Sequence, residues 1–246
     1  MPMSAIEIPR LGADPRSPFP PASRWQHPEG LVAWGGDLHP ARLLNAYQNG
    51  IFPWYEPGSP ILWWSPRPRA VMIPGAMTIS RRLKRRLRQG RFEVRLDTCF
   101  ETVIAACAAP RDHDGGTWIT PKMLKAYCRL HALGHAHSVE IFIGEKLAGG
   151  LYGVAIGKIF FAESKFHHVT DASKIALAIL MRCLEQWDFL LADCQIWNPH
   201  LERLGVRLLD REDFLALVDE GCRRADPPGS WTERLAKVDL NWTCEL

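Results

Sequence analysis

The stretch HSVEIFIGEKLAGGLYGVAIGKIFFAESKF, residues 137–166, decides the fold that the sequence predicts. It contains three largely apolar segments, 137–143, 146–157 and 158–166; the break GE separates the first two, and the pair GK lies at the junction of the last two. Short breaks that contain glycine suit tight hairpin turns. We therefore expect three consecutive strands that pair as an antiparallel meander.

The next part of the chain predicts a crossover to a further strand. Residues 171–187 have the apolar periodicity of a helix, with Thr170 or Asp171 as its cap. The apolar run FLLADCQI at 189–196 is typical of a buried strand. A strand that follows a crossover helix is normally parallel to the strand before it. The result is a mixed sheet with helices on its faces, an α+β fold.

Three helices are expected upstream of the meander. A basic segment, an apolar segment and a segment that opens on Thr-Pro each carry helical spacing or a capping residue. They are expected at Thr78–Arg88, at Asp97–Ala108 with Asp97 as cap, and from Thr120-Pro121 to Gly134.

The N-terminal part has a different composition. Residues 9–74 are crowded with proline, glycine and tryptophan, which leaves little room for long regular elements. One short helix is expected at Pro40–Asn49, because proline opens it, apolar residues recur in it and Gly50 ends it. The composition changes after about Pro68. We therefore expect a small, loop-rich N-terminal domain at 1–67 and a larger domain at 68–246.

Composition excludes several classes of protein. The chain has 246 residues, a formal net charge of +3 and 47% hydrophobic residues, which is typical of a folded globular protein. Its seven cysteines form no CxxC pair, so neither a disulfide framework nor a zinc ribbon is indicated. The first residues lack the apolar segment of a signal peptide, and no apolar run approaches the length of about 18 residues that spans a membrane. We expect a cytoplasmic protein without a membrane span.

Polar residues interrupt two strands that are expected to be buried. Asp193 and Gln195 are two residues apart and point to the same face, at the carboxyl end of a strand, where sheets of this kind bind ligands. Glu163 lies in an aromatic strand and must be paired, hydrogen-bonded or protonated if it is buried. A polar pair satisfied by the backbone and an edge carboxylate in water are the structural alternatives. The glycines within 149–153 fit a bound ligand and a packing bulge equally well.

The segment RRLKRRLRQGR at 81–91 contains seven basic residues and no acidic residue. Such a run suits the phosphates of a nucleic acid, and a solvated helix face is the alternative. His131 and His135 have the spacing of a helical metal site, but Gly134 is expected to end the helix between them, which disfavours metal binding. No GxSxG, Walker or GxGxxG motif supports a serine hydrolase, a nucleotide hydrolase or a dinucleotide enzyme.

Five segments match, in order, the motifs of one known family. They are GLVAWGGDLHPARLLNAYQNGIFPWYEPGSPILWWSPRPRAV, GGTWITPKMLKAYCRLHALGHAHSVE, GGLYGVAIGKIFFAESKF, DASKIALAIL and DCQIWNPHLERLG. On these motifs the chain resembles the bacterial leucyl/phenylalanyl-tRNA-protein transferase family, from about Phe19 to Val218. The resemblance implies a small N-terminal domain followed by a domain of acetyltransferase-like, GNAT-type architecture.

The resemblance also implies a reaction. Leucine or phenylalanine, and less well methionine, would move from aminoacyl-tRNA to the α-amino group of proteins that begin with Lys or Arg, marking them for N-degron proteolysis. The implied partners are leucyl-tRNA, phenylalanyl-tRNA and these acceptor proteins. Aminoacyl esters are already activated, so no cofactor, ATP or metal is expected.

Site residues are implied in the same way. Asp193 would hold Gln195, and Gln195 would bind and polarise the attacking amine. Glu163 would attract the cationic N-terminal residue or help to take the proton of the amine. The residues that match the family's pocket for the amino-acid side chain and the terminal adenosine are Trp54, Trp118, Phe160, Leu151 and Leu180. The residues that fall on its tRNA patch are Arg81, Arg82, Lys84, Arg85, Arg86 and Arg88.

The chain departs from the family at several pocket positions. Leu151 and Lys165 stand where relatives often have methionine, His167-His168 replaces a smaller polar and basic pair, and Leu180 stands where an aromatic residue can occur. These departures bear on the preference among leucine, phenylalanine and methionine, and they leave the class of reaction unchanged.

Two other functions compete with this interpretation. A coenzyme-A-dependent N-acetyltransferase needs a glycine-containing pyrophosphate loop before the long helix, and the junction FHHVTDASK has no glycine. A tRNA-binding protein without activity would explain the basic run and the tryptophans. This function assigns no role to Asp193, Gln195 and Glu163.

Overall fold

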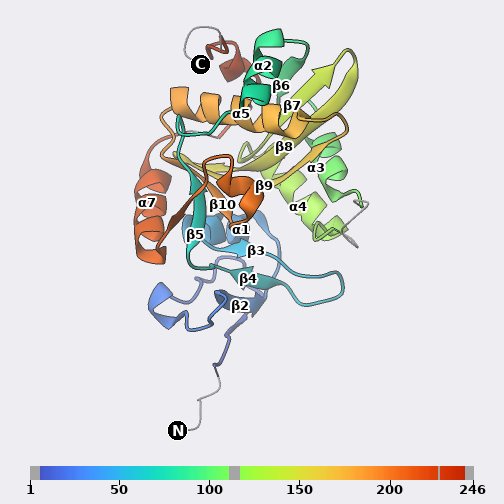
Figure 1. Ribbon diagram of the computed structural model, residues 1–246. Coiled ribbons are helices and arrows are strands. Elements are labelled where there is room, and N and C mark those ends of the chain that lie inside the picture. Colours follow the sequence, from blue (N-terminus) through green and yellow to red (C-terminus); the bar gives the residue numbers. More distant parts are fainter. Residues whose placement is uncertain (1–5, 111–116, 227, 242–246) are drawn as a thin grey trace.

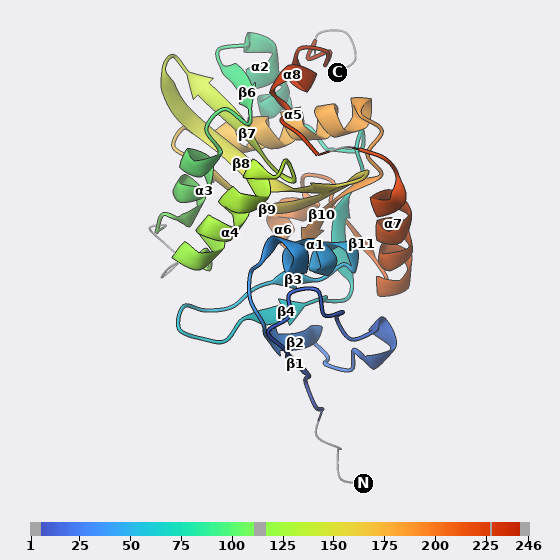
Figure 2. The same ribbon diagram turned by 180° about the vertical axis from the view of Figure 1, so that it is seen from behind.

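A computed structural model describes residues 6–110, 117–226 and 228–241. Within them the chain forms two mixed β-sheets and eight α-helices, which confirms the expected α+β class. Residues 1–5 and 242–246, the outer ends of the two expected domains, lie outside this part. Figures 1 and 2 show the larger sheet between helices, with the smaller sheet at one end of the molecule.

The larger sheet has the strand order β11-β5-β10-β9-β8-β7-β6. β7, β8 and β9 pair antiparallel in chain order, which confirms the predicted meander. β10 pairs parallel to β9, as the crossover rule predicts. The strands are β5 (Arg69–Met72), β6 (Glu93–Leu96), β7 (Ala136–Ile143), β8 (Lys146–Ile156), β9 (Ile159–His167), β10 (Leu191–Gln195) and β11 (Arg207–Leu209).

β9 and β10 pair over only part of their length. The last pair of their ladder is Phe161 with Asp193, and β9 continues beyond it to His167. β10 is irregular at Cys194 against β5, and Gln195 has a φ of 56°, a left-handed conformation that is uncommon for a residue with a side chain. The two strands therefore diverge, and a wedge opens between them.

Helices cover both faces of the larger sheet (Figures 1 and 2). α5 (Ala172–Gln186) and α2 (Arg81–Gln89) contribute to the core on one face. α3 (Phe100–Ala108) and α4 (Pro121–Ala132) contribute to the core on the other. The remaining helices are α6 (Pro199–Glu202), α7 (Arg211–Arg223) and α8 (Thr232–Leu235). No helix in the described ranges is long and apolar enough to cross a membrane.

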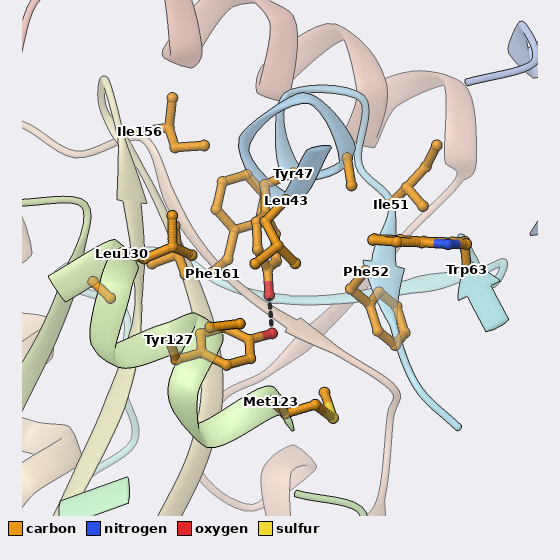
Figure 3. Packing of buried hydrophobic residues seen from close by; sticks show 14 of the residues in the cluster. Leu43, Tyr47, Ile51, Phe52, Trp63, Met123, Tyr127, Leu130, Ile156 and Phe161 are labelled. Atoms are coloured by element: carbon orange, nitrogen blue, oxygen red, sulfur yellow. Dashed lines mark hydrogen bonds between the residues drawn. The ribbon is translucent and has the colours of Figure 1, made fainter. Parts of the chain in front are cut away.

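The smaller sheet has the order β1-β2-β4-β3 and packs with α1 (Pro40–Gln48), which confirms the predicted N-terminal helix. Its strands are β1 (Arg10–Leu11), β2 (Leu31–Gly35), β3 (Phe52–Pro53) and β4 (Leu62–Trp64), and a 3₁₀ helix spans Ala22–Arg24. Leu43 and Tyr47 of α1 belong to one buried cluster with Tyr127 of α4 and Phe161 of β9 (Figure 3). The two sheets therefore share a continuous core.

The predicted cap of the third helix is wrong. α3 begins at Phe100 rather than Asp97, and Asp97 turns away with a φ of 60° to accept hydrogen bonds from the backbone N–H groups of Ser138 and Trp231. The buried carboxylate of Glu140 accepts from the N–H groups of Thr98 and Cys99 instead. Both N–H groups precede the first residue of α3, so the helix begins without a side-chain cap.

Other predicted helix boundaries differ less. The basic helix begins at Arg81, not Thr78, because Ser80 is extended and its hydroxyl accepts from the N–H of Leu83. Thr120 caps α4 as predicted, by accepting from the N–H of Met123. Asp171 occupies the predicted cap position of α5, but its carboxylate pairs with the side chains of Arg82 and Lys174.

The glycine-rich strand β8 is explained by packing. A Cβ atom on Gly153 would lie 2.4 Å from both the ring of Phe160 and the carbonyl oxygen of Phe161, and the β8–β9 register shifts at this point. A Cβ atom on Gly149 would lie 2.7 Å from the Cβ of Ala172. Of the two alternatives from the sequence, the packing bulge is the one observed.

We expect Gly153→Ala to lower the free energy of unfolding by about 2–3 kcal/mol, because the strand must shift to admit a methyl group against backbone. Urea unfolding measures this change. Gly12→Ala is the matched control, since a Cβ atom there meets nothing within 4 Å, and its effect should stay within about 0.5 kcal/mol. Equal effects of the two substitutions would contradict this explanation of the bulge.

Candidate active site

A cavity of about 320 Å³ fills the wedge between β9 and β10. Its walls come from Ala162–Lys165 of β9, Cys194–Ile196 at the end of β10, Leu151 of β8 and Leu177 of α5. The segment 52–54, which begins in β3, closes it from the side of the smaller sheet. The cavity therefore lies where strand divergence, the long helix and the N-terminal sheet meet.

The structure brings together five of the predicted site residues. Glu163, Gln195, Trp54, Trp118 and Leu151 all line the cavity. Trp54 is 44% exposed, so it lies at the mouth, whereas Leu151 is buried.

The other predicted pocket residues do not line this cavity. Phe160 and Leu180 are fully buried in the core under α5. They can influence the cavity only through the side chains that pack on them. The sequence places Phe160 two residues before Ala162, the first lining residue of β9, and its side chain lies in the core.

Asp193 also lies behind the cavity. It is fully buried, and its two carboxylate oxygens accept hydrogen bonds from Nε and Nη2 of Arg69 at 2.8 and 2.6 Å. The rings of Phe52 and Phe214 lie 4.9 and 4.5 Å from the Arg69 guanidinium. Arg69 of β5 therefore donates to both carboxylate oxygens of Asp193. The sequence did not predict this partner.

Asp193 connects to the cavity through the backbone. Its Oδ1 accepts from the N–H of Gln195 at 2.9 Å, and this bond holds Gln195 in its left-handed conformation. A residue with φ above zero at the end of a strand is often part of a binding site. Asp193 is thus placed to position Gln195 rather than to touch a ligand.

Glu163 lies at the polar end of the cavity. Its Oε1 lies 2.7 Å from the hydroxyl oxygen of Tyr47 and accepts from Nε2 of Gln195 at 3.4 Å, and its Oε2 accepts from the hydroxyl of Tyr127 at 2.9 Å. Burial raises the pKa of Glu163 to about 7, although the two tyrosine hydroxyls oppose this rise. The carboxyl group can therefore exchange a proton near neutral pH.

Neither tyrosine was predicted from the sequence to belong to the site. The periodicity of its helix marks Tyr47 only as an apolar residue, and Tyr127 lies in a predicted helix without an acidic residue. The one available signal was the need of a buried Glu163 for partners, which does not say where they are.

The wall of the cavity is largely apolar. Trp54, Trp118, Leu151 and Leu177 form this surface, and Glu163 and Gln195 supply polar groups beside it. Pockets with apolar walls and a few convergent polar groups are typical of small-molecule sites. The arrangement can hold an apolar side chain next to a carboxyl and an amide group.

The basic residues of α2 face solvent. Leu83 and Leu87 are buried and fix the orientation of the helix, which leaves its basic residues at or near the surface. They are Arg81, Arg82, Lys84, Arg85, Arg86 and Arg88. Arg82 pairs with Asp171 at the start of α5, so α2 is anchored beside the long helix.

Two histidines in this part of the chain, His131 and His137, have structural contacts. His131 stacks on Phe100 with a centroid distance of 4.3 Å, and His137 stacks on Trp231 at 3.9 Å while its Nδ1 contacts Asp97. Among the described residues, no group of three or more His, Cys, Asp or Glu side chains is arranged to hold a metal ion.

Comparison with known proteins identifies the family. Residues 71–219 match the family model for leucyl/phenylalanyl-tRNA protein transferase, and residues 36–67 match the model for the N-terminal domain of the same family. A leucyl/phenylalanyl-tRNA–protein transferase of Xanthomonas campestris pv. campestris (strain 8004) is 54% identical over 226 residues, 91% of each chain. The protein of that name from Azoarcus sp. (strain BH72) is 51% identical over 228 residues, 92% of this chain and 97% of the relative. The chain belongs to the leucyl/phenylalanyl-tRNA protein transferase family.

Proposed function

We propose that this protein transfers leucine or phenylalanine, and less well methionine, from aminoacyl-tRNA to the α-amino group of proteins that begin with Lys or Arg. The observation that carries the proposal is the apolar cavity of about 320 Å³ with Glu163 and Gln195 beside its apolar wall. An aminoacyl ester needs both features: a pocket for its side chain and polar groups near its carbonyl. Family membership supports the same reaction.

The apolar wall holds the side chain of the transferred amino acid. Trp54, Trp118 and Leu151 contact it, and Phe160 and Leu180 support the wall from the core. A missing methylene in such a pocket is worth only about 1–3 kcal/mol, so selection among apolar side chains is moderate. The exposed ring of Trp54 at the mouth is available to stack on the terminal adenosine.

The polar groups act on the acceptor. The amide of Gln195 binds and polarises the attacking amine, and Glu163 attracts the cationic N-terminal residue or helps to take the proton of the amine. Asp193 acts as a positioning residue, since Arg69 neutralises its charge and its oxygen holds the Gln195 N–H. The ester is already activated, so orientation and proton transfer account for the rate without ATP, a metal or another cofactor.

The basic residues of α2 bind the phosphates of the tRNA acceptor stem. Their surface position and the absence of acids among residues 81–91 support this role. We further propose that the domains divide near residue 67, that the larger one has GNAT-type architecture, and that the protein acts in the cytoplasm to mark proteins for N-degron proteolysis. The order of the meander β7–β9, the helix α5 and the parallel strand β10 supports this architecture.

A transfer assay tests the proposed function. Purified protein is mixed with radiolabelled leucyl-tRNA and either an Arg-starting or a Gly-starting peptide. Acid-stable label on the Arg peptide alone is the expected result. No transfer by a folded protein that still binds tRNA in a salt-sensitive way would reject the catalytic function and favour a tRNA-binding protein.

We expect Gln195→Ala to lower kcat roughly 100-fold, because alanine has no polar group that reaches the reacting atoms. The free energy of unfolding should change little, since Gln195 is only partly buried. Single-turnover rates and urea unfolding measure the two quantities. Full activity of this variant would remove Gln195 from the reaction.

Asp193→Leu should behave differently, because it leaves Arg69 buried without its acceptor. We expect a loss of about 3–5 kcal/mol in the free energy of unfolding. The double variant Arg69→Met/Asp193→Leu should recover most of that stability but not the activity, because the Gln195 N–H still lacks its acceptor. Recovery of activity in the double variant would contradict the positioning role.

Arg85→Gln/Arg86→Gln should weaken binding of aminoacyl-tRNA, and the slope of log K against log salt should fall by about 1 for each phosphate that is no longer neutralised. Fluorescence anisotropy at several salt concentrations measures both effects. Arg223→Gln on α7 is the control, because this exposed arginine pairs with the exposed Asp219 in the i,i+4 position. Equal slopes for both variants would place the tRNA surface elsewhere.

A further inference from the structure

Three oxygen-bearing side chains beside the cavity form a closed triangle. The hydroxyl oxygens of Tyr47 and Tyr127 are 2.5 Å apart, and they lie 2.7 and 2.9 Å from Oε1 and Oε2 of Glu163. Figure 3 shows the two hydroxyl groups facing each other inside the apolar cluster. Both tyrosines are at most 1% exposed, so the contact between their hydroxyl groups is closed to bulk solvent, and Glu163 faces the cavity.

The triangle has three short oxygen–oxygen distances, and each needs a proton between its two oxygens. Two tyrosine hydroxyls supply only two protons, since each phenol carries one. If Glu163 is ionised, one side of the triangle has two lone pairs facing each other at hydrogen-bonding distance. If Glu163 is protonated, three protons fill the three sides: Tyr47 donates to Tyr127, Tyr127 donates to Oε2, and the carboxyl proton on Oε1 returns to Tyr47.

We propose that Glu163 is a neutral carboxylic acid in the resting protein and that Tyr47 and Tyr127 are positioning residues that link its two oxygens as a proton relay. When the three protons move together around the triangle, the carboxyl proton passes from Oε1 to Oε2. Glu163 can therefore release a proton at one oxygen and recover one at the other. This inference deepens the proposed function and rests on it.

The surroundings favour the neutral form. From β10 and β5, the charges of Asp193 and Arg69 cancel in their own ion pair. From β8, the buried hydroxyl of Tyr152 has no hydrogen-bond partner among the described residues and carries no charge. Of the residues that the structure describes, Lys165, on the same strand as Glu163, is the remaining charged residue of the cavity wall. Burial raises the pKa of Glu163 to about 7, in agreement with the proton count.

The relay is consistent with the proton balance of the transfer reaction. A neutral amine attacks the ester carbonyl, the C–N bond forms, and the C–O bond to the ribose breaks with its electron pair on the ribose oxygen. Glu163 gives its proton to that oxygen, and the amine gives one proton back to the carboxylate. The products are an amide and a ribose hydroxyl, and the triangle ends with three protons, as it began.

Infrared spectroscopy tests the proton count without any substrate. The spectrum of the wild type minus that of Glu163→Gln should show the C=O stretch of one protonated carboxyl group at pH 6, and this band should disappear with a midpoint near pH 7. Tyr127→Phe should shift the band to higher frequency, because the carbonyl oxygen no longer accepts a hydrogen bond. Absence of the band at pH 6 would overturn the proposal.

Kinetics test the use of the relay. The wild-type kcat/KM should fall as pH rises above about 7, because an ionised Glu163 has no proton to donate, and Glu163→Gln should lack this falling limb. Tyr47→Phe and Tyr127→Phe should each lower kcat about tenfold with KM changed less than about twofold. Tyr55→Phe is the matched control, since this buried tyrosine lies 3.3 Å from the Thr120 hydroxyl instead, and its kcat should be unchanged.

The outcomes separate the two hypotheses. Retention of the falling limb in Glu163→Gln, or equal losses in Tyr55→Phe and Tyr127→Phe, would overturn the relay while transfer by the wild type still upholds the proposed function. A protonated carboxyl band in a wild type that transfers nothing would reject the proposed function and the catalytic use of the relay, and would support the three-proton count alone.

Discussion

A salt bridge between Arg69 and Asp193, buried behind the cavity, holds the geometry of the candidate site. It joins β5 to β10, and the rings of Phe52 and Phe214 enclose the guanidinium. Two buried charges cost several kcal/mol in desolvation, and an apolar pair of similar volume would often be as stable. The ion pair also fixes the backbone of Gln195. The Asp193 carboxylate accepts from the N–H of Gln195 at the point where β10 diverges from β9.

The divergence of β9 from β10 explains why a cavity exists inside a well-packed domain. Continued pairing would fill the wedge with a strand ladder, so the opening depends on the ladder ending at Phe161 and Asp193. α1, which packs with the smaller sheet, places Tyr47 beside Glu163, and α4 places Tyr127 there. The polar end of the cavity therefore forms only when both sheets are packed against each other. The shared core links the stability of the N-terminal part to the integrity of the site.

Local patterns in the sequence predicted most of the secondary structure. The meander, the parallel β10, the helix at Pro40 and the cap at Thr120 follow from alternation, periodicity and turn residues, which act between neighbours in the chain. The predicted cap at Asp97 is wrong because its carboxylate binds Ser138 and Trp231, which are far along the chain, and α3 begins at Phe100 without a side-chain cap. A cap motif predicts a helix start only where no distant donor competes for the same side chain.

The sequence by itself determined the α+β class, the order of the strands in the meander and the resemblance that singled out Asp193, Gln195 and Glu163. It could not show that Asp193 is buried behind the cavity, or which residues satisfy these carboxylates. Arg69 lies 124 residues from Asp193 in the chain, and Tyr47 lies 116 residues from Glu163. Contacts at such separations leave no period or spacing in the sequence, because they depend on how finished elements pack. Only the tertiary structure decided them.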